Sequence, residues 1–314
     1  MSDAASDPVD LLERARAGER GALARLLSIV ERGGPPARAL GRLTHPLGGG
    51  AYTLGITGAP GAGKSTLTNA LVERMRGDQV AVAVLAVDPS SPFSGGAILG
   101  DRVRMSDHTG DPEVFIRSMA TRGHLGGLSL ATLDAIRTLD ASGWPWIVVE
   151  TVGVGQVEVE VAGAADTTVV VVNPGWGDAV QANKAGLLEI ADVFVINKAD
   201  RPGSDETRRD LDRMLDLTTA TGWRPPVLAT IASTGEGVSD LWAAVGDHRA
   251  HLEASGQLVE RRRDRVGAEL TEIVAALLRE RAATSTADRL QHLAAEVADR
   301  RLDPWSAAEH LLPD

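Results

Sequence analysis

Cysteine is absent from this sequence of 314 residues, and aromatic residues and long apolar runs are scarce. Without cysteine the chain cannot form a disulfide or a thiolate metal site, and this composition suits a reducing compartment. With 3% aromatic residues, few stacking platforms exist for single-stranded nucleic acid. Apolar runs such as Val169–Val172 are far too short to span a bilayer. Because the acidic start does not read as a signal peptide, we expect a cytoplasmic protein.

An excess of positive charge is also lacking, because acidic residues outnumber basic ones and the formal net charge is −11. Nucleic acid and anionic membranes both require a basic field, so we expect neither as a partner. The one basic stretch, Glu260–Arg265, is typical of a solvated helix face with mixed charges.

The middle of the sequence alternates short β-branched runs with helical stretches. The runs are nearly continuously apolar, as in strands that are covered on both faces. This alternation predicts an α/β fold with a doubly wound, mostly parallel sheet, in which ligands bind beyond the carboxyl ends of the strands. The predicted strands are Tyr52–Thr57, Val80–Val87, Trp146–Val149, Thr167–Val172, Val193–Ile196 and Val227–Thr230.

We expect three parts along the chain: a helical N-terminal extension at residues 1–45, the sheet domain at 46–252 and a helical C-terminal arm at 253–314. Leucines at helical spacing predict one or two N-terminal helices with a break near Gly18. The stretch "RGGPPAR" around Gly33–Pro36 is expected to end this helical region.

The C-terminal arm carries an apolar stripe between Val266 and Leu278 at steps of three and four residues. A second helical segment follows around residues 290–302, and a third begins with Asp303 as its cap and Pro304 at its first position. The stripe either packs on the parent domain, which is the usual arrangement, or makes an oligomer contact.

The stretch "GAPGAGKST", between a predicted strand and a predicted helix, satisfies the pattern G-x-x-x-x-G-K-[ST] of a phosphate-binding loop. Its glycines let backbone N–H groups surround phosphate oxygens, and the helix that follows adds its positive end. Lys64 can neutralise the β- and γ-phosphates, and Ser65 can place its hydroxyl on Mg²⁺. The predicted nucleotide contacts in this loop are Gly58, Ala59, Gly61, Ala62, Gly63, Lys64, Ser65 and Thr66.

Such a metal ion also needs acidic ligands at neighbouring strand ends. Glu150 follows a buried run, and the amide of Gly153 three residues later can meet a γ-phosphate. Asp88 and Asp101 are further candidates for the metal, together with Ser65. Each of these acids can instead cap a helix, although a carboxylate beside bound phosphates requires a cation.

The stretch "NKAD" follows the strand "DVFVI" and predicts recognition of a guanine base. The carboxylate of Asp200 can accept hydrogen bonds from two guanine donors that adenine lacks, which favours GTP over ATP. The stem of Lys198 can lie along the ring, and Asn197 can tie this loop to the phosphate loop. Ser233 and Thr234, in "IAST", follow the next strand and can offer backbone N–H groups to the guanine oxygen.

Two long polar segments between the second and third predicted strands, "DPSSPFSGGAILGDRVRM" and "FIRSMATRGHLGGLS", are expected to be mobile switch loops. Their arginines contact phosphate or form structural ion pairs, and none is assigned a catalytic role: Arg102, Arg104, Arg117 and Arg122. Val154 stands where a glutamine could orient water, so we expect slow hydrolysis without a partner.

Taken together, the sequence resembles the MeaB/MMAA family of GTPases, formerly labelled ArgK, over about residues 45–312. The stretches that carry the resemblance are "GAPGAGKST", "AVDPSSPFSGGAILGDRVRM", "RSMATRGHLGGLS", "ETVGVGQVE", "PGWGDAVQANKAG", "NKAD" and "DPWSAAEHLL". The resemblance implies a P-loop GTPase domain that uses GTP, GDP and Mg²⁺. It also implies a chaperone of an adenosylcobalamin-dependent acyl-CoA mutase, chiefly methylmalonyl-CoA mutase, which gates cofactor loading from an adenosyltransferase and protects or reactivates the mutase. Adenosylcobalamin belongs to that mutase and not to this chain. The resemblance also implies a homodimer joined through the C-terminal helical arms.

The resemblance further implies roles for single residues. Magnesium or switch roles fall on Asp88, Asp101 and Glu150. A third mobile segment that responds to the mutase matches at Asp178, Gln181 and Lys184, although their three-residue steps also suit a polar helix face. The predicted catalytic residues are Lys64, Glu150, Gly153 and Lys184.

Three other functions fit parts of the pattern. A GTP-dependent metallochaperone needs a soft-metal site, which scattered histidines without cysteine do not suggest. A kinase that acts on a transport protein or an amino acid needs an acceptor pocket and a base, and no sequence feature points to either. The intact Lys64, Ser65 and Glu150 do not favour a nucleotide-gated scaffold without turnover, although a very slow switch would resemble one.

Overall fold

In a computed structural model, the chain forms two compact units, Met1–Arg262 and Arg263–Asp314. The structure describes residues 7–89, 108, 110–121, 130–151, 157–175, 186, 189–217, 222–285 and 287–311.

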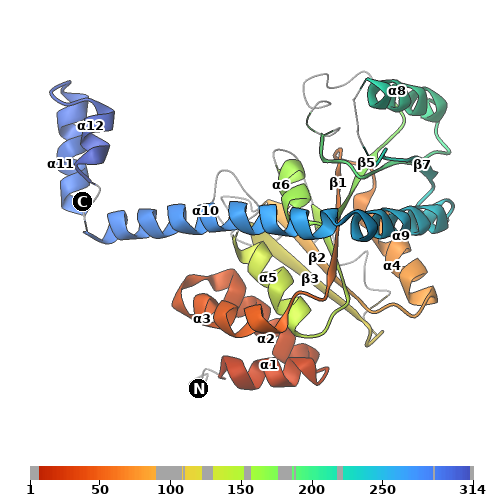
Figure 1. The fold of residues 1–314 in the computed structure, drawn as a ribbon, viewed down its shortest axis with the longest axis horizontal. Helices are drawn as coiled ribbons and strands as arrows, with labels where there is room; N and C mark the ends of the chain where they lie inside the picture. The colour runs from red at the N-terminus through yellow and green to blue at the C-terminus, as the bar shows by residue number, and fades with distance from the viewer. Residues whose placement is uncertain are drawn as a thin grey trace. The chain divides into compact units, whose positions relative to one another are not determined.

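The first unit is built on a parallel seven-stranded sheet in the order β3-β2-β4-β1-β5-β6-β7. Figure 1 shows this sheet among its helices. This confirms the predicted doubly wound α/β fold. Because β1 lies between β4 and β5 while β2 follows it in the chain, the strand order reverses beside β1, where such folds bind ligands. The strands are β1 Tyr52–Gly58, β2 Val82–Pro89, β3 Val114–Thr121, β4 Trp146–Thr151, β5 Thr167–Val172, β6 Val193–Asn197 and β7 Val227–Thr230.

Helices cover both faces of the sheet, as the continuous apolar runs predict. Successive strand residues point to opposite faces, so Val169 and Val171 pack toward α4 and α9, whereas Val170 and Val172 pack toward α8. Helices α2, α5 and α6 complete the second face over β2 to β4. These helices are α4 Lys64–Gly77, α5 Leu130–Ala141, α6 Val157–Ala164, α8 Ser204–Asp216 and α9 Val238–Ser255.

The N-terminal residues form three helices that share the core of the second sheet face. The predicted break near Gly18 is confirmed by α1 (Pro8–Arg16) and α2 (Arg20–Arg32). The prediction that helical structure ends at Gly33–Pro36 is wrong, because α3 (Gly34–Thr44) and the short helix η1 (His45–Leu47) follow. The two prolines lie in the first turn of α3, where a helix tolerates a missing N–H donor.

Strand β3 corrects a second prediction, since part of the expected switch loop is an edge strand paired with β2. The central residues Arg117 and Ser118 are polar, so the pattern of continuous apolar runs did not predict this strand. Arg117 lies there and contacts Glu31 and Ser28 of α2. The arginine thus forms a structural ion pair with the N-terminal helices. Apart from Asp88 and Pro89 at the end of β2 and Phe115–Thr121 in β3, the residues of both expected switch loops lie outside the described part.

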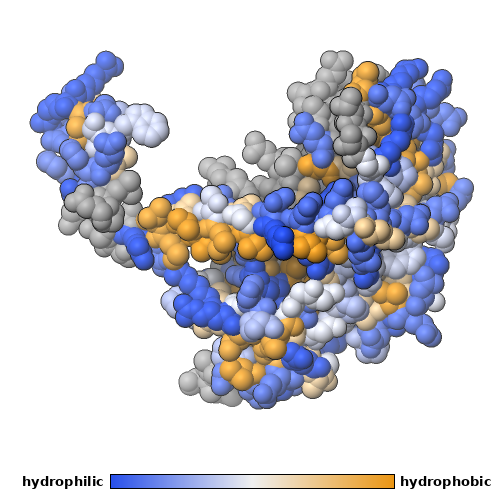
Figure 2. All heavy atoms as spheres, viewed as in Figure 1, coloured by the Kyte–Doolittle hydropathy of each residue, from blue (hydrophilic) through white to orange (hydrophobic). Residues whose placement is uncertain are grey.

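The second unit contains most of α10 (Gln257–Ser285), then α11 (Ala287–Ala298) and α12 (Pro304–Glu309). Asp303 caps α12 by accepting hydrogen bonds from two backbone N–H groups, which confirms the predicted cap and Pro304 as the first helical residue. Figure 2 shows apolar side chains gathered along α10. The exposed apolar residues of α10 in this unit are Val266, Leu270, Val274, Leu277 and Leu278. In the described part of the chain, no helix has the length and apolar content to cross a membrane.

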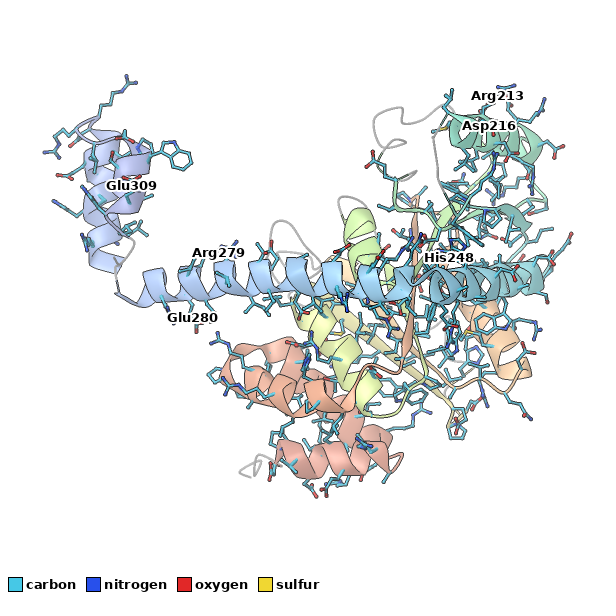
Figure 3. All side chains as sticks on the ribbon, viewed as in Figure 1. Arg213, Asp216, His248, Arg279, Glu280 and Glu309 are labelled. Carbon is cyan, nitrogen blue, oxygen red and sulfur yellow. The ribbon has the colours of Figure 1, made fainter. Side chains whose placement is uncertain are left out.

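At the amino end of the sheet, two buried carboxylates precede β5 and β6 and are paired with arginines at the start of α10. Asp166 accepts hydrogen bonds from Arg262 at 2.7 and 3.2 Å. Asp192 accepts from both terminal nitrogens of Arg261, at 3.0 and 2.8 Å. His248 of α9, labelled in Figure 3, is fully buried with its Nε2 atom 3.2 Å from Asp192 Oδ1. These pairs fix the first turns of α10 to the sheet.

This network predicts a contribution to stability that depends on pH. Burial alone would raise the pKa of Asp192, but hydrogen bonds and charge from His248 and Arg261 outweigh it and hold the pKa below its ordinary value of 3.8. Ionised Asp192 therefore stabilises the fold above that value, and the contribution is lost as the pH falls through the lower folded-state pKa.

We expect Arg261→Met to lower the free energy of unfolding at pH 7 by about 1–3 kcal/mol, because Asp192 loses two charged hydrogen bonds. The deficit relative to the unaltered protein should shrink when urea unfolding is repeated near pH 3. Arg224→Met, which breaks an exposed pair with Asp216, is the matched control and should change stability little. A deficit of equal size at both pH values would contradict this role of Asp192.

Candidate functional site

The predicted phosphate loop lies between the end of β1 and the start of α4, at the carboxyl edge of the sheet. Two glycines are required there by close approach and by positive φ angles. A Cβ atom on Gly58 (φ 131°) would lie 2.0 Å from the carbonyl oxygen of Val171 in β5. One on Gly63 (φ 91°) would lie 2.5 Å from Asn197 Nδ2. The loop is therefore packed against β5 and β6, which fixes its course.

Lys64 is the first residue of α4, and its side chain turns back over the loop. Its Nζ atom donates to the carbonyl oxygens of Gly58 at 2.8 Å and Ala59 at 3.2 Å. The residue is 7% exposed. The ammonium group thus lies at the amino end of a helix of 14 residues, where backbone N–H groups and the helix dipole also favour an anion.

Ser65 and Glu150 meet beside this loop. The hydroxyl of Ser65 donates to Glu150 Oε1 at 2.5 Å, and Glu150, in β4 next to β1, is 1% exposed. One residue further along β4, Thr151 Oγ1 donates to Thr57 Oγ1 of β1 at 3.1 Å. A hydroxyl and a buried carboxylate are the hard oxygen ligands that Mg²⁺ accepts, so their chemistry fits this metal.

The stretch Asn197–Asp200 at the end of β6, called the base loop below, is joined to the phosphate loop by two side chains. Asn197 Nδ2 donates to the carbonyl oxygen of Ala62 at 2.8 Å. Lys198, which has a positive φ of 60°, donates from Nζ to the carbonyl oxygen of Gly61 at 2.6 Å. Asp200 is exposed two residues further on. The predicted tie between the two loops through Asn197 is thus present in the structure.

The loop after β7 completes this edge. It reverses tightly, with Ile231 N donating to the carbonyl oxygen of Glu236 at 3.0 Å, and it leaves Ser233 and Thr234 exposed. Sequence reasoning missed two residues here. Thr230 Oγ1 and the backbone N of Ala232 each donate to Asn197 Oδ1 at 3.1 Å. The local sequence does not indicate this contact of Thr230, because the residue is simply the last one of a predicted strand.

Several predicted residues have side chains that fall outside the described part of the structure. Asp88 lies near the carboxyl end of β2, but its side chain is not among those described. The other predicted site residues outside the described part are Asp101, Gly153 and Lys184, and Val154, Asp178 and Gln181 lie outside it as well. Within the described ranges, no group of three or more histidine or acidic residues could hold a metal ion.

Comparison with known proteins gives consistent matches over most of the chain. A family profile described as methylmalonyl Co-A mutase-associated GTPase MeaB matches residues 23–287. A protein of Pyrococcus horikoshii that is named as a GTPase is 49% identical over 310 residues, 97% of this chain and 98% of that protein. GTPase ArgK of Escherichia coli is 39% identical over 258 residues, 79% of this chain and 77% of ArgK.

Two further matches extend this comparison. The mitochondrial methylmalonic aciduria type A homolog of Mus musculus is 38% identical over 216 residues, 67% of this chain and 52% of the mouse protein. Among solved structures, that of a LAO/AO transport system kinase gives a TM-score of 0.73 at 27% identity. The superposition covers 99% of this chain and 98% of that one.

Proposed function

This chain belongs to the family of methylmalonyl Co-A mutase-associated GTPases MeaB, and from that premise we propose that it is the chaperone of an adenosylcobalamin-dependent acyl-CoA mutase. As a GTPase it cleaves GTP to GDP and phosphate. In the proposed role this reaction gates cofactor loading from an adenosyltransferase and protects or reactivates the mutase in the cytoplasm. Adenosylcobalamin is then held by the mutase.

The observation that carries the proposed GTP site is the contact between the two loops at Asn197. Its side chain donates a hydrogen bond to the phosphate loop, and the exposed Asp200 follows three residues later in the base loop. GTP would lie with its phosphates over Gly58–Thr66 and its base against Lys198 and Asp200. A carboxylate at position 200 accepts from guanine N1–H and N2–H₂, which adenine does not offer. The backbone at Ser233 and Thr234 would face the guanine oxygen.

The catalytic proposal relies on positioning and electrostatics, because no side chain of the site is an evident general base. Mg²⁺ would be held by Ser65 and Glu150, with Asp88 and Asp101, and would neutralise charge on the β- and γ-phosphates. Water attacks the γ-phosphorus and GDP leaves. Lys64 stabilises the negative charge that develops on the oxygen between the β- and γ-phosphorus atoms.

Two further elements depend on the partner in this proposal. The amide of Gly153 would bind the γ-phosphate. Lys184, in the segment with Asp178 and Gln181, would enter the site when the mutase binds. Val154 cannot orient water, so the protein alone hydrolyses GTP slowly.

We also propose that the chain acts as a homodimer joined through the C-terminal arm. Five exposed apolar residues recur on α10 between Val266 and Leu278 at helical spacing (Figure 2). A continuous exposed stripe of this kind is typical of an interface between protein subunits.

The expected result that tests this function is slow basal GTP hydrolysis that rises several-fold when a cobalamin-dependent acyl-CoA mutase is added. Phosphate release is measured with the full chain alone, with methylmalonyl-CoA mutase and with a cobalamin-independent enzyme as the control. A fast basal rate that no such mutase changes would contradict the chaperone role and leave the GTPase intact.

A kinase remains the second candidate, favoured by the structural match to a protein described as a LAO/AO transport system kinase. The two functions differ in the acceptor of the γ-phosphoryl group. Incubation with γ-labelled GTP and candidate acceptors distinguishes them, since our proposal expects label in inorganic phosphate only.

A further inference from the structure

We propose that Thr230 is a positioning residue of the nucleotide site, which acts on the guanine base through Asn197. The inference rests on the proposed placement of guanine beside Asn197–Asp200. Thr230 is the last residue of β7 and lies opposite Asn197 in the pairing of β6 with β7. It is fully buried.

Thr230 holds the base loop on both sides of Lys198. Its Oγ1 atom donates to Asn197 Oδ1 at 3.1 Å, and its carbonyl oxygen accepts from Ala199 N at 3.1 Å. Between these two contacts, Lys198 has a φ of 60°, which costs free energy in any residue with a side chain. Such a conformation persists only when its surroundings impose it, and Thr230 supplies bonds before and after it.

The same hydroxyl sets the orientation of the Asn197 amide. Asn197 Oδ1 faces two donors, Thr230 Oγ1 and Ala232 N, so its Nδ2 atom is directed to the phosphate loop, where it donates to Ala62. A reversed amide would place its NH₂ group against the N–H of Ala232 and lose the bond to Ala62. Because the Ala232 donor belongs to the backbone, Thr230 is the side chain whose loss would weaken this arrangement.

Removing the hydroxyl should weaken nucleotide binding more than catalysis. A neutral hydrogen bond in a buried site is worth about a tenfold change in affinity, so Thr230→Val should speed GDP dissociation about tenfold. The hydroxyl bonds to the base loop and reaches the phosphate loop only through Asn197, so kcat at saturating GTP should change less than about twofold. Thr230→Ser keeps the hydroxyl and should restore slow dissociation.

The experiment measures dissociation of a fluorescent GDP analogue and GTP hydrolysis by the full chain. The control is Thr138→Val in α5, which also removes a buried threonine hydroxyl, one that donates to the carbonyl oxygen of Asp134 at 2.7 Å. It should lower stability without changing GDP dissociation. In a double-mutant cycle, adding Thr230→Val to Asn197→Ala should speed dissociation less than about twofold further, because the threonine acts through the asparagine.

The outcomes separate this inference from the nucleotide site on which it rests. If Asn197→Ala weakens GDP binding but Thr230→Val behaves like Thr138→Val, the positioning role is overturned and the site stands. If Thr230→Ser speeds GDP dissociation as much as Thr230→Val does, the positioning role is likewise overturned, because the hydroxyl would then not be the group that slows dissociation. If Asn197→Ala itself leaves GDP binding unchanged, the proposed site is wrong and the inference falls with it.

Discussion

Replacing Lys64 by alanine is expected to lower kcat/KM for GTP hydrolysis by about 100- to 1,000-fold. This is the typical cost of removing one preorganised charged donor from a phosphoryl-transfer or oxyanion site. The ammonium group is held over the loop by the carbonyl oxygens of Gly58 and Ala59, at the amino end of α4. Alanine at this position keeps the helix start but removes the positive charge that would meet the β- and γ-phosphates.

Arg117→Ala is the matched control for this prediction. Arg117 is another partly buried cation, which the sequence allowed to be a phosphate contact, but it pairs with Glu31 of α2. Its loss should lower the free energy of unfolding and leave phosphate release at saturating GTP nearly unchanged. Circular dichroism and urea unfolding show whether each variant is folded. Hydrolysis by folded Lys64→Ala within tenfold of the unaltered protein would contradict the proposed role of the lysine.

The parts of the site that sequence alone predicted are those with a local pattern. The phosphate loop has an unusual spacing of Gly58, Gly63, Lys64 and Ser65 between a buried run and a helix. The stretch that begins at Asn197 also directly follows a buried run. Since parallel strands bring their carboxyl ends to one edge, these motifs were expected to meet, and the structure confirms the tie between Asn197 and the phosphate loop.

The features that sequence reasoning missed depend on which strands become neighbours. β3 has a polar middle because Arg117 finds its partner on α2, 86 residues away in the chain. Thr230 becomes part of the site only because β7 pairs with β6 in a register that places it opposite Asn197. Neither partner can be read from a local window, because strand order and register are set by packing of the whole sheet.

Gly63→Ala is expected to weaken GDP binding by about 10- to 100-fold, the second largest effect on this site. The substitution has two separable costs. A φ of 91° strains any residue with a Cβ atom by about 1–2 kcal/mol. The added Cβ would also lie 2.5 Å from Asn197 Nδ2, so the asparagine must move and release its bond to Ala62. Losing that bond loosens both the phosphate loop and the base loop.

Gly143→Ala isolates the first of these costs. Gly143 has a similar φ of 96°, but a Cβ atom added there would meet nothing within 4 Å, and the residue is in the turn between α5 and β4. Gly63→Ala should therefore lose more stability than Gly143→Ala in urea unfolding, and only Gly63→Ala should weaken GDP binding in a fluorescence titration. If the two variants bind GDP equally well, close packing of Asn197 on the phosphate loop does not govern affinity. Weakened GDP binding in Gly63→Ala but not in Gly143→Ala would assign the loss to this one contact between the two loops, because the strain of a positive φ is common to both variants.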